Sequence, residues 1–420
     1  MSEANTVLPR PRLAQATLLL ASTLTVMAGA TISPALPGIE ETFANAPPLD
    51  LLVIALGPAV LVGLVLTTHG LFIAVGSPLI GAVADRFGRR RLLLLSTVVY
   101  ALAGGSGFVL DSLVGILVGR GILGLAVAGI TVTVTALITD YYEEDYRNTV
   151  LGRQAAFMAF GGVLLLPLGG VLADVGWRFP FLVYTVSVLL LPAMILSLPE
   201  PERTEPTGDR PTDFAALRRT LARVPLGTLA LVYAVGLIGQ LVFYMIPVQG
   251  PFYLESQTGI SPTLVGVTLG LSTLSGGIVS IGYGRIRKRA SVITIVAFTF
   301  GFMSVGYVIV GLSGSLLGIL VGLVIAGFGT GLLLPNLNTW LTAAVPESVR
   351  GRALGGLTSA YFFGQFLSPI VTRPIADVVG LATTFRWVGV AMAGGALAFG
   401  LAAVVASPPA ETEADEQPAD

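Results

Sequence analysis

Long uncharged stretches alternate along this chain with short charged clusters. Residues 51–84 contain no Asp, Glu, Lys or Arg, and neither do residues 92–110, yet five charged residues lie between them, from Asp85 to Arg91. A helix that crosses a bilayer needs about 20 apolar residues. Divided at charges and turn residues, the pattern predicts membrane-spanning helices at 14–37, 52–81, 92–110, 113–139, 150–173, 180–198, 226–249, 262–284, 291–311, 315–343, 351–375 and 384–406.

Composition supports an all-α integral membrane protein with these twelve transmembrane helices. Hydrophobic residues make up 54% of the chain and charged residues only 11%, whereas a soluble domain carries about 25% charged residues. The net charge of −1 gives no reason to expect a nucleic-acid partner. The chain has no cysteine and a single histidine, which excludes thiolate and multi-histidine metal sites. We therefore expect no metal, no cofactor and no enzymatic activity.

The distribution of positive charge predicts the orientation of the spans. Twelve spans place both termini on one side of the membrane, and cytoplasmic loops carry an excess of Lys and Arg. With the amino terminus inside, most of the 23 Lys and Arg residues fall in cytoplasmic segments. The exceptions are Arg120, Arg178, Arg373 and Arg386. The expected location is the cell membrane, with both termini in the cytoplasm.

An internal repeat divides the spans into two six-helix halves. At an offset of 203 residues, Arg147 aligns with Arg350, and the sequence LVGRGILG at 117–124 aligns with LVGLVIAG at 320–327. Aligned Arg and Gly residues are harder to attribute to apolar composition than aligned Leu and Val. The expected organisation is an N-terminal half at 1–198, a cytoplasmic linker at 199–224, a C-terminal half at 225–406 and a tail at 407–420.

The linker and the tail differ from the spans in composition. The linker begins Pro-rich and mixed in charge, and then places Phe214, Leu217 and Leu221 at helical spacing. This spacing predicts a short amphipathic helix on the inner leaflet, and a plain solvated linker is the alternative. The acidic, Pro-containing tail is expected to be disordered.

The loop after the second predicted span reads GAVADRFGRR. Together with twelve spans in two halves, this loop resembles the signature G-x-x-x-D-R-x-G-R-R of the major facilitator superfamily, and more broadly the family's twelve-span drug/proton antiporter branch. The resemblance implies a transporter that works by alternating access, in which this loop is a conformational latch that stabilises one state. The matching positions are Gly81, Asp85, Arg86, Gly88, Arg89 and Arg90.

Elementary chemistry agrees with a latch, and a simple topology signal is the alternative. Gly81 and Asp85 share a helix face at i, i+4 spacing, so another helix can approach at the glycine and interact with the carboxylate. The second half has only a degenerate copy, GYGRIRKR, in which Gly284 takes the position of Asp85. The latch is therefore expected to work from the first half only.

Two further motifs lie within spans. Arg120 and Gly124 resemble the family motif of an arginine followed four residues later by a glycine. A charged side chain at the centre of a spanning helix costs about 2.5–3.5 kcal/mol on insertion scales, so Arg120 is a candidate for coupling or transport. The alternative is a structural arginine bonded to backbone carbonyls. The fifth span matches the antiporters' Gly- and Pro-rich motif only approximately, with Pro167, Gly169 and Gly170.

The spans contain few polar side chains that can line a substrate cavity. No predicted span has an acidic residue at its middle, which disfavours a permanently cationic substrate and favours a neutral or anionic amphipathic solute. Each of the candidates can equally serve packing. The candidates are Gln240, Tyr244, Asn336, Tyr361 and Gln365.

His69 is the candidate for proton coupling. It lies twelve residues before Gly81, about 18 Å along a helix at 1.5 Å per residue, which places it near mid-membrane. Histidine has an ordinary pKa near neutral pH, whereas arginine does not release its proton in this range. A packed histidine without a proton role is the alternative.

These observations predict a secondary transporter that exports neutral or anionic amphipathic compounds in exchange for protons. Uptake or export of a small metabolite, a sugar or an organic anion, coupled or uncoupled, is the alternative. Neither a polytopic enzyme nor a receptor is favoured, and no G-x-x-x-x-G-K-[ST] motif indicates ATP-driven pumping. The expected partners are a small-molecule substrate, protons and membrane lipid, and the expected functional unit is a monomer.

Overall fold

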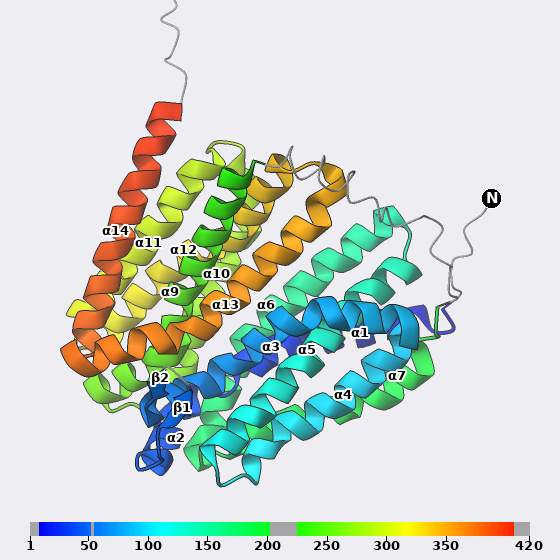
Figure 1. Ribbon diagram of the computed structural model, residues 1–420, viewed down its shortest axis with the longest axis horizontal. Helices are drawn as coiled ribbons and strands as arrows, with labels where there is room; N and C mark the ends of the chain where they lie inside the picture. The colour runs from blue at the N-terminus through cyan, green and yellow to red at the C-terminus, as the bar shows by residue number, and fades with distance from the viewer. Residues whose placement is uncertain (1–7, 52–53, 202–224, 407–420) are drawn as a thin grey trace, which may run out of the picture.

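A computed structural model describes residues 8–51, 54–201 and 225–406. Two helical bundles lie side by side, the first half at lower right in Figure 1 and the second half at upper left. The first half contains α1 (Pro11–Ala30), η1 (Ser33–Ala35), α2 (Leu36–Phe43), β1 (Leu49–Leu51), β2 (Ile54–Leu56), α3 (Pro58–Phe87), α4 (Arg89–Gly105), η2 (Ser106–Phe108), α5 (Leu113–Tyr141), α6 (Glu144–Val175), η3 (Phe179–Leu190) and α7 (Leu191–Ser197).

The second half repeats this architecture in register with the sequence repeat. It contains α9 (Leu226–Thr258), α10 (Pro262–Arg287), α11 (Val292–Leu312), α12 (Leu316–Ala344), α13 (Glu347–Val379) and α14 (Leu381–Ala406). At the offset of 203 residues, the bounds of α5 coincide with those of α12, and α6 and α13 begin together. Ser112 and Ser315 cap α5 and α12 in the same way, each accepting a bond from the backbone N–H three residues later.

Twelve transmembrane segments in two halves confirm the predicted fold class. Among the described residues, eleven helices are long and apolar enough to cross a membrane. The twelfth segment, α13, has 33 residues, which is long enough to span. Polar residues such as Gln365, Ser368 and Arg373 lower its hydropathy. The predicted amphipathic helix of the linker, over 202–224, and the predicted disordered tail, over 407–420, lie outside the described residues.

Three spans differ locally from the expected continuous helices. The first breaks after Ala30 and continues through η1 and α2, because Pro34 has no N–H to donate to the preceding turn. The second starts at Pro58 rather than at residue 52, after an antiparallel hairpin that pairs Leu49 with Leu56. The sixth consists largely of η3, a 3-10 helix of twelve residues, which is long for this conformation.

Each half has its own hydrophobic core, and the halves meet along two seams. In one seam α3 packs against α13, and in the other α6 packs against α10. We call the side where α3 and α5 end and α4 and α6 begin the linker face. The opposite side, which carries β1 and β2, is the hairpin face (Figure 1).

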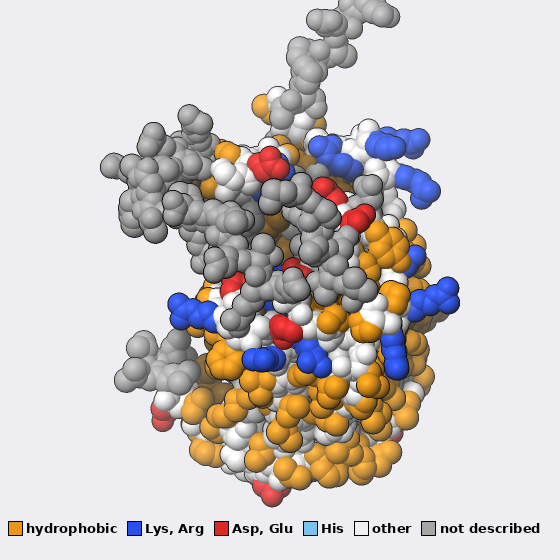
Figure 2. Space-filling model, turned by 90° about the vertical axis from the view of Figure 1, so that its right-hand side faces the viewer, with side chains coloured by type: hydrophobic (Ala, Val, Ile, Leu, Met, Phe, Trp, Pro, Cys, Tyr) orange, Lys and Arg blue, Asp and Glu red, His pale blue; other side chains and the backbone are white. Residues whose placement is uncertain are grey.

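The two seams are closed toward the hairpin face and open toward the linker face. Residues 60–70 of α3 are all buried, whereas most of 71–87 are not. On α6, residues 166, 169 and 170 are buried, but none of residues 151–161 is. On α10, many of residues 265–276 are buried, but none of residues 277–287 is. A helix that buries no face has no packed neighbour along that stretch. The halves therefore separate toward the linker face, where Figure 2 shows many of the Lys and Arg side chains.

Polar contacts also join the halves at the hairpin face. The Arg373 guanidinium of α13 donates to the Glu40 carboxylate of α2 at 2.6 Å and to Asp377 at 2.9 Å, and it lies 5.0 Å from the centre of the Phe252 ring. The Ser33 hydroxyl donates to the Pro247 carbonyl at 2.6 Å. Arg373 is only 13% exposed at its side chain, so its pair with Glu40 is better shielded from solvent than an ordinary surface pair. These contacts hold the hairpin face closed.

Charge reversal at this pair is expected to open the hairpin face. Arg373→Glu places two carboxylates against each other, and a change of 1–2 kcal/mol alters a two-state ratio by about 5–30-fold. Spin labels on cysteines introduced at positions 41 and 255, both exposed at this face on opposite halves, should report longer distances. The double variant Glu40→Arg/Arg373→Glu should restore the shorter ones.

Arg178→Glu is the matched control. Arg178 pairs with Asp111 at 2.5 Å on the same face but within one half. The variant should leave the distances between positions 41 and 255 unchanged. If it lengthens them as much as Arg373→Glu does, or if the double variant fails to restore them, the Glu40–Arg373 pair does not hold the halves together.

Candidate functional site

Arg120 lies at the centre of the first half, with only 1% of its surface exposed. Its Nε donates to the Val65 carbonyl of α3 at 2.7 Å, and Nη1 donates to the Tyr184 hydroxyl of η3 at 3.0 Å. Nη2 donates to the Ala28 carbonyl of α1 and lies 3.2 Å from Nδ1 of His69. One guanidinium therefore links α1, α3, α5 and η3, and it bonds to two carbonyls, a hydroxyl and an imidazole, none of them a carboxylate.

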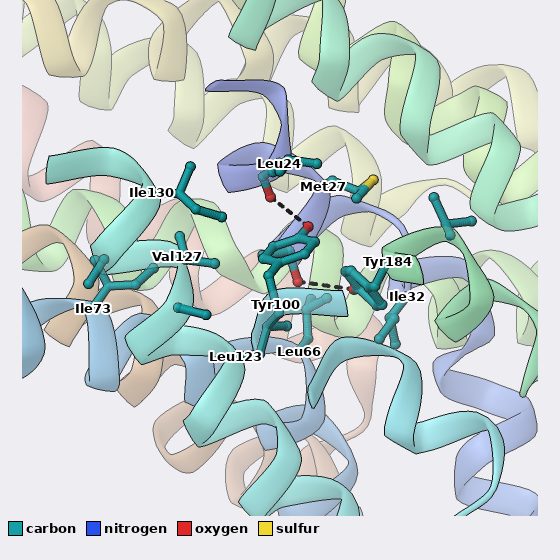
Figure 3. Close-up of a cluster of buried hydrophobic side chains, with 14 of the residues drawn as sticks. Leu24, Met27, Ile32, Leu66, Ile73, Tyr100, Leu123, Val127, Ile130 and Tyr184 are labelled. Carbon is teal, nitrogen blue, oxygen red and sulfur yellow. Dashed lines mark hydrogen bonds between the residues drawn. The ribbon is translucent and has the colours of Figure 1, made fainter. Parts of the chain in front are cut away.

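Two tyrosines complete this polar centre. The Tyr184 hydroxyl also donates to the Ala28 carbonyl at 3.2 Å, and the Tyr100 hydroxyl of α4 donates to the Leu24 carbonyl at 2.7 Å. Figure 3 shows both rings among Leu, Ile and Val side chains. Their bonds satisfy carbonyl oxygens of α1 near the point where that helix breaks.

His69 joins this centre to the second half. Arginine can only donate hydrogen bonds, so the His69 Nδ1 accepts from Arg120 and Nε2 carries the ring hydrogen. Nε2 lies 3.3 Å from the side-chain amide of Gln365 on α13. The atom of this amide nearest to Nε2 is its nitrogen. Exchanging the nitrogen and oxygen of the Gln365 amide, an assignment made from the hydrogen-bond network, places the oxygen where it accepts the Nε2 hydrogen. His69 is thus hydrogen-bonded on one side to its own half and on the other to the opposite half.

Glycines bring the four helices around His69 close together. A Cβ on Gly124 would overlap the His69 carbonyl and lie 2.9 Å from its Cα, so α5 approaches α3 only because this residue has no side chain. A Cβ on Gly70 would lie 2.9 Å from the Gln365 amide. A Cβ on Gly29 would lie 3.4 Å from His69 Nε2 and 3.5 Å from the Tyr244 hydroxyl, which places α1 and α9 beside the ring.

The repeat keeps the glycine contact but not the charged pair. At the offset of 203 residues, Ser272 corresponds to His69, Leu323 to Arg120 and Gly327 to Gly124. A Cβ on Gly327 would overlap the Ser272 carbonyl, as one on Gly124 would overlap that of His69. The Ser272 hydroxyl donates to the Leu323 carbonyl at 2.8 Å. Packing therefore requires the glycine in both halves, whereas the Arg120–His69 pair occurs only in the first half.

The other cavity candidates divide between the seam and the second half. Gln240 and Tyr361 lie on α9 and α13, each 8% exposed. Asn336 lies apart from them: it donates to the Val292 carbonyl at 2.9 Å and accepts from the Tyr283 hydroxyl at 3.3 Å, both within the second half. Of these candidates, Tyr244 and Gln365 therefore lie beside His69, whereas Asn336 bonds within the second half.

The latch loop makes its contacts within the first half and the start of the linker. Gly88, with φ +100°, ends α3 and lets α4 begin immediately. Arg89 bonds to Asp140 of α5 and lies 3.8 Å from Asp85. The backbone N–H groups of Arg90 and Arg91 donate to the Glu200 carboxylate at 3.2 and 3.3 Å.

Among the described residues, no second helix approaches Gly81. A Cβ there would meet no described atom within 4 Å. A latch contact to the second half thus stays a prediction for the opposite state.

Sequence reasoning identified Arg120, Gly124 and His69 but not their partners. Tyr184 gave a weak signal, as a tyrosine inside an otherwise apolar span. The carbonyls of Ala28 and Val65 gave none, since every residue has one. Among the described residues, no group of three His, Asp or Glu side chains is arranged to hold a metal ion.

Two halves of six spans around a polar centre define a multi-pass membrane transporter. The sequence profile of the Major Facilitator Superfamily matches residues 18–369 and 250–419. The chain belongs to this superfamily, so it is a transporter of small molecules and not an enzyme.

The relatives differ in what they carry. The cis,cis-muconate transport protein of Acinetobacter baylyi is 25% identical, over 76% of this chain and 79% of that protein. The quinolone resistance protein NorA of Staphylococcus aureus is 22% identical, over 79% of this chain and 85% of that protein. A bacterial homologue of the human lysosomal transporter Spinster has a TM-score of 0.78 at 18% identity, covering 96% of this chain and 98% of that chain. A D-xylose–proton symporter has a TM-score of 0.74 at 17% identity, covering 93% and 97% respectively.

Gly124→Ala is expected to destabilise the protein. The added methyl meets backbone atoms of His69, and overpacking of this kind costs about 1–3 kcal/mol. Gly81→Ala meets open space and should raise stability slightly, because alanine favours a helix by about 1 kcal/mol over glycine. Thermal unfolding in detergent compares the two variants, and equal melting temperatures would contradict the close approach of α5 to α3.

Proposed function

We propose that this protein is a secondary active transporter of the cell membrane that exports neutral or anionic amphipathic compounds in exchange for protons. It works by alternating access, as a monomer, with both termini in the cytoplasm. The observation that carries the proposal is His69, which bonds to Arg120 in one half and lies against Gln365 of the other. A single titratable group at the seam connects proton binding to the relative position of the halves.

Alternating access is supported by the asymmetry of the seams. Contacts such as Glu40–Arg373 join the halves at the hairpin face, whereas α6 and α10 bury no residue over 151–161 and 277–287. The positive side chains of the linker face (Figure 2) favour the cytoplasmic side for that face. On this orientation the structure is open to the cytoplasm, the side from which an exporter collects its substrate.

Proton coupling is supported by the donor and acceptor roles at His69. A proton on Nδ1 turns that atom into a donor, so it can no longer accept from Arg120. It also places a second positive charge beside the guanidinium, with no described carboxylate bonded to either group. Proton binding and the Arg120–His69 bond are therefore mutually exclusive. The same His69 ring contacts Gln365 of the opposite half, so protonation of His69 affects the seam between the halves.

The substrate class is supported by the position of the charges. The acids of the described membrane helices lie near helix ends, such as Asp85, Asp140 and Glu255, so no mid-membrane carboxylate favours a cationic substrate. The name of NorA associates that relative with quinolones, which supports efflux. The muconate relative and the buried positive charge of Arg120 favour the second candidate, transport of an organic anion, coupled or uncoupled.

Transport in inside-out vesicles is expected to distinguish these functions. Vesicles containing the protein should accumulate a fluorescent fluoroquinolone when their lumen is acidic, and the accumulation should collapse with a protonophore. At one proton per substrate, a gradient of one pH unit supports about tenfold accumulation, since 1.4 kcal/mol is a factor of ten. Transport of labelled cis,cis-muconate without quinolone accumulation would replace efflux by the organic-anion function.

His69→Gln is expected to uncouple the transporter. Glutamine can bond to both Arg120 and Gln365 but binds no proton in this pH range. Downhill exchange should therefore persist while gradient-driven accumulation falls to the equilibrium level. Ser272→Ala, at the equivalent position of the second half, should keep accumulation. If His69→Gln accumulates substrate as the unmodified protein does, the proton carrier lies elsewhere.

A further inference from the structure

A stripe of polar side chains follows one face of α13 through the middle of the membrane. Its members recur at i, i+4, i+7 and i+11, the spacing of one helix face. All four are buried, with exposures of 8%, 2%, 0% and 2% in chain order. They are Tyr361, Gln365, Ser368 and Thr372. Gln365 contacts His69, so the stripe continues from the candidate site toward the hairpin face.

Several polar atoms along this stripe have no hydrogen-bond partner among the described residues. These atoms are the Tyr361 and Ser368 hydroxyls, the Gln249 side-chain carbonyl oxygen of α9 and the Thr67 hydroxyl of α3. Most helical Ser and Thr hydroxyls here donate to a carbonyl three or four residues earlier, as Thr372 does to Ser368 at 2.7 Å. A buried donor or acceptor without a partner is destabilising, so the group calls for an explanation.

The unpaired groups converge from both halves. The Gln249 amide donates to Thr372 at 3.3 Å, which joins α9 to the stripe. On α3, a Cβ on Gly63 would contact Pro369, and one on Gly70 would contact Gln365. Thr67 lies between these two glycines on the same helix face, so it faces α13 near Ser368. All four members of the stripe are buried, so this part of the seam is closed in the present state.

Helix packing does not require these polar residues. At the offset of 203 residues, the positions on α6 that correspond to the stripe are apolar or glycine, although α6 packs against α10 in the equivalent seam. They are Met158, Gly162, Leu165 and Gly169. The seam between α6 and α10 therefore closes with apolar residues and glycine on α6, at the positions where α13 carries hydroxyl and amide groups in the seam with α3.

We propose that Thr67, Gln249, Ser368 and Thr372 form a binding surface for an uncharged, hydrogen-bonding part of the substrate, exposed when the halves separate at the hairpin face. The proposal rests on alternating access, the proposed mode of transport. The four side chains offer hydroxyls and an amide, which both donate and accept, and no charge. They therefore suit hydroxyl, carbonyl or amide groups, and they give no advantage to a cation. A substrate that forms these bonds would supply the partners that the closed seam lacks.

Thiol labelling tests whether the surface opens to water. Single cysteines replace Ser368, Ser272 and Val371 in this cysteine-free chain, and the protein in lipid nanodiscs is treated with a membrane-impermeant methanethiosulfonate. Ser272 is a buried serine with a bonded hydroxyl, and Val371 is 42% exposed on the helix carrying the stripe. Ser368→Cys should react, and at least fivefold faster when Arg373→Ala removes the ion pair at the hairpin face. The other two should react slowly in both backgrounds.

Protection of Ser368→Cys tests the chemistry of the ligand. Chloramphenicol, a neutral amphipathic compound with hydroxyl and amide groups, should slow labelling at least threefold at saturating concentration. Tetraphenylphosphonium, a permanent cation without hydrogen-bonding groups, should not. Protection by the cation alone, or by neither compound, overturns the binding surface, as does a Ser368→Cys that never reacts or reacts no faster than Ser272→Cys.

Failure of this proposal is distinguishable from failure of the proposed efflux. Labelling needs only that the seam opens, so it is measured without transport. If Ser368→Cys is labelled and is protected but the protein does not accumulate a fluoroquinolone, the binding surface is supported and the efflux assignment is contradicted. If the protein exports the fluoroquinolone while Ser368→Cys stays unreactive, efflux is supported and the binding surface is contradicted.

Discussion

The buried guanidinium of Arg120 is the interaction on which the first half depends. A charge at this depth is tolerated only when its donors find acceptors inside the protein, and here the acceptors come from α1, α3 and η3. Carbonyl oxygens and a phenol solvate the charge without neutralising it. The site therefore keeps a net positive charge next to His69. Removal of any one acceptor would leave a donor unpaired, at a cost of about 1–3 kcal/mol or more for a charged group.

The internal repeat shows which contacts helix packing requires in both halves and which occur in one half alone. Gly124 and Gly327 admit the same close helix contact in each half, so the glycine of the arginine–glycine motif belongs to the architecture. The charged pair has only the neutral Ser272–Leu323 contact as its counterpart. On α13 the asymmetry is reversed, because the second half carries the polar stripe and the first half carries Leu165 and glycines. The buried Arg120 of the first half and the uncharged polar stripe of the second half thus approach each other where His69 contacts Gln365.

The two membrane faces are held by different kinds of contact. At the hairpin face an ion pair, Glu40–Arg373, crosses between the halves and is largely shielded from water. At the linker face the latch loop binds Asp140 and Glu200, which belong to its own half and to the linker. A contact within one half does not distinguish the states, whereas a contact between halves does. The state described here is therefore stabilised from the hairpin face.

The sequence by itself determined the number of spans and the two halves, and it singled out Arg120, Gly124, His69 and the loop at 81–90 as candidates. These follow from hydropathy, repeat spacing and local motifs, which are properties of neighbouring residues. The break in the first span has a local cause in Pro34. The hairpin before α3 and the 3-10 helix of the sixth span did not follow from the sequence, because such departures are decided by packing between segments. Nor did it assign partners: Arg120 bonds to a carbonyl 92 residues away, and His69 contacts an amide 296 residues away. Polar groups in a membrane must find partners inside the protein, but which distant partner each one finds depends on how the helices cross, and only the tertiary structure decided that.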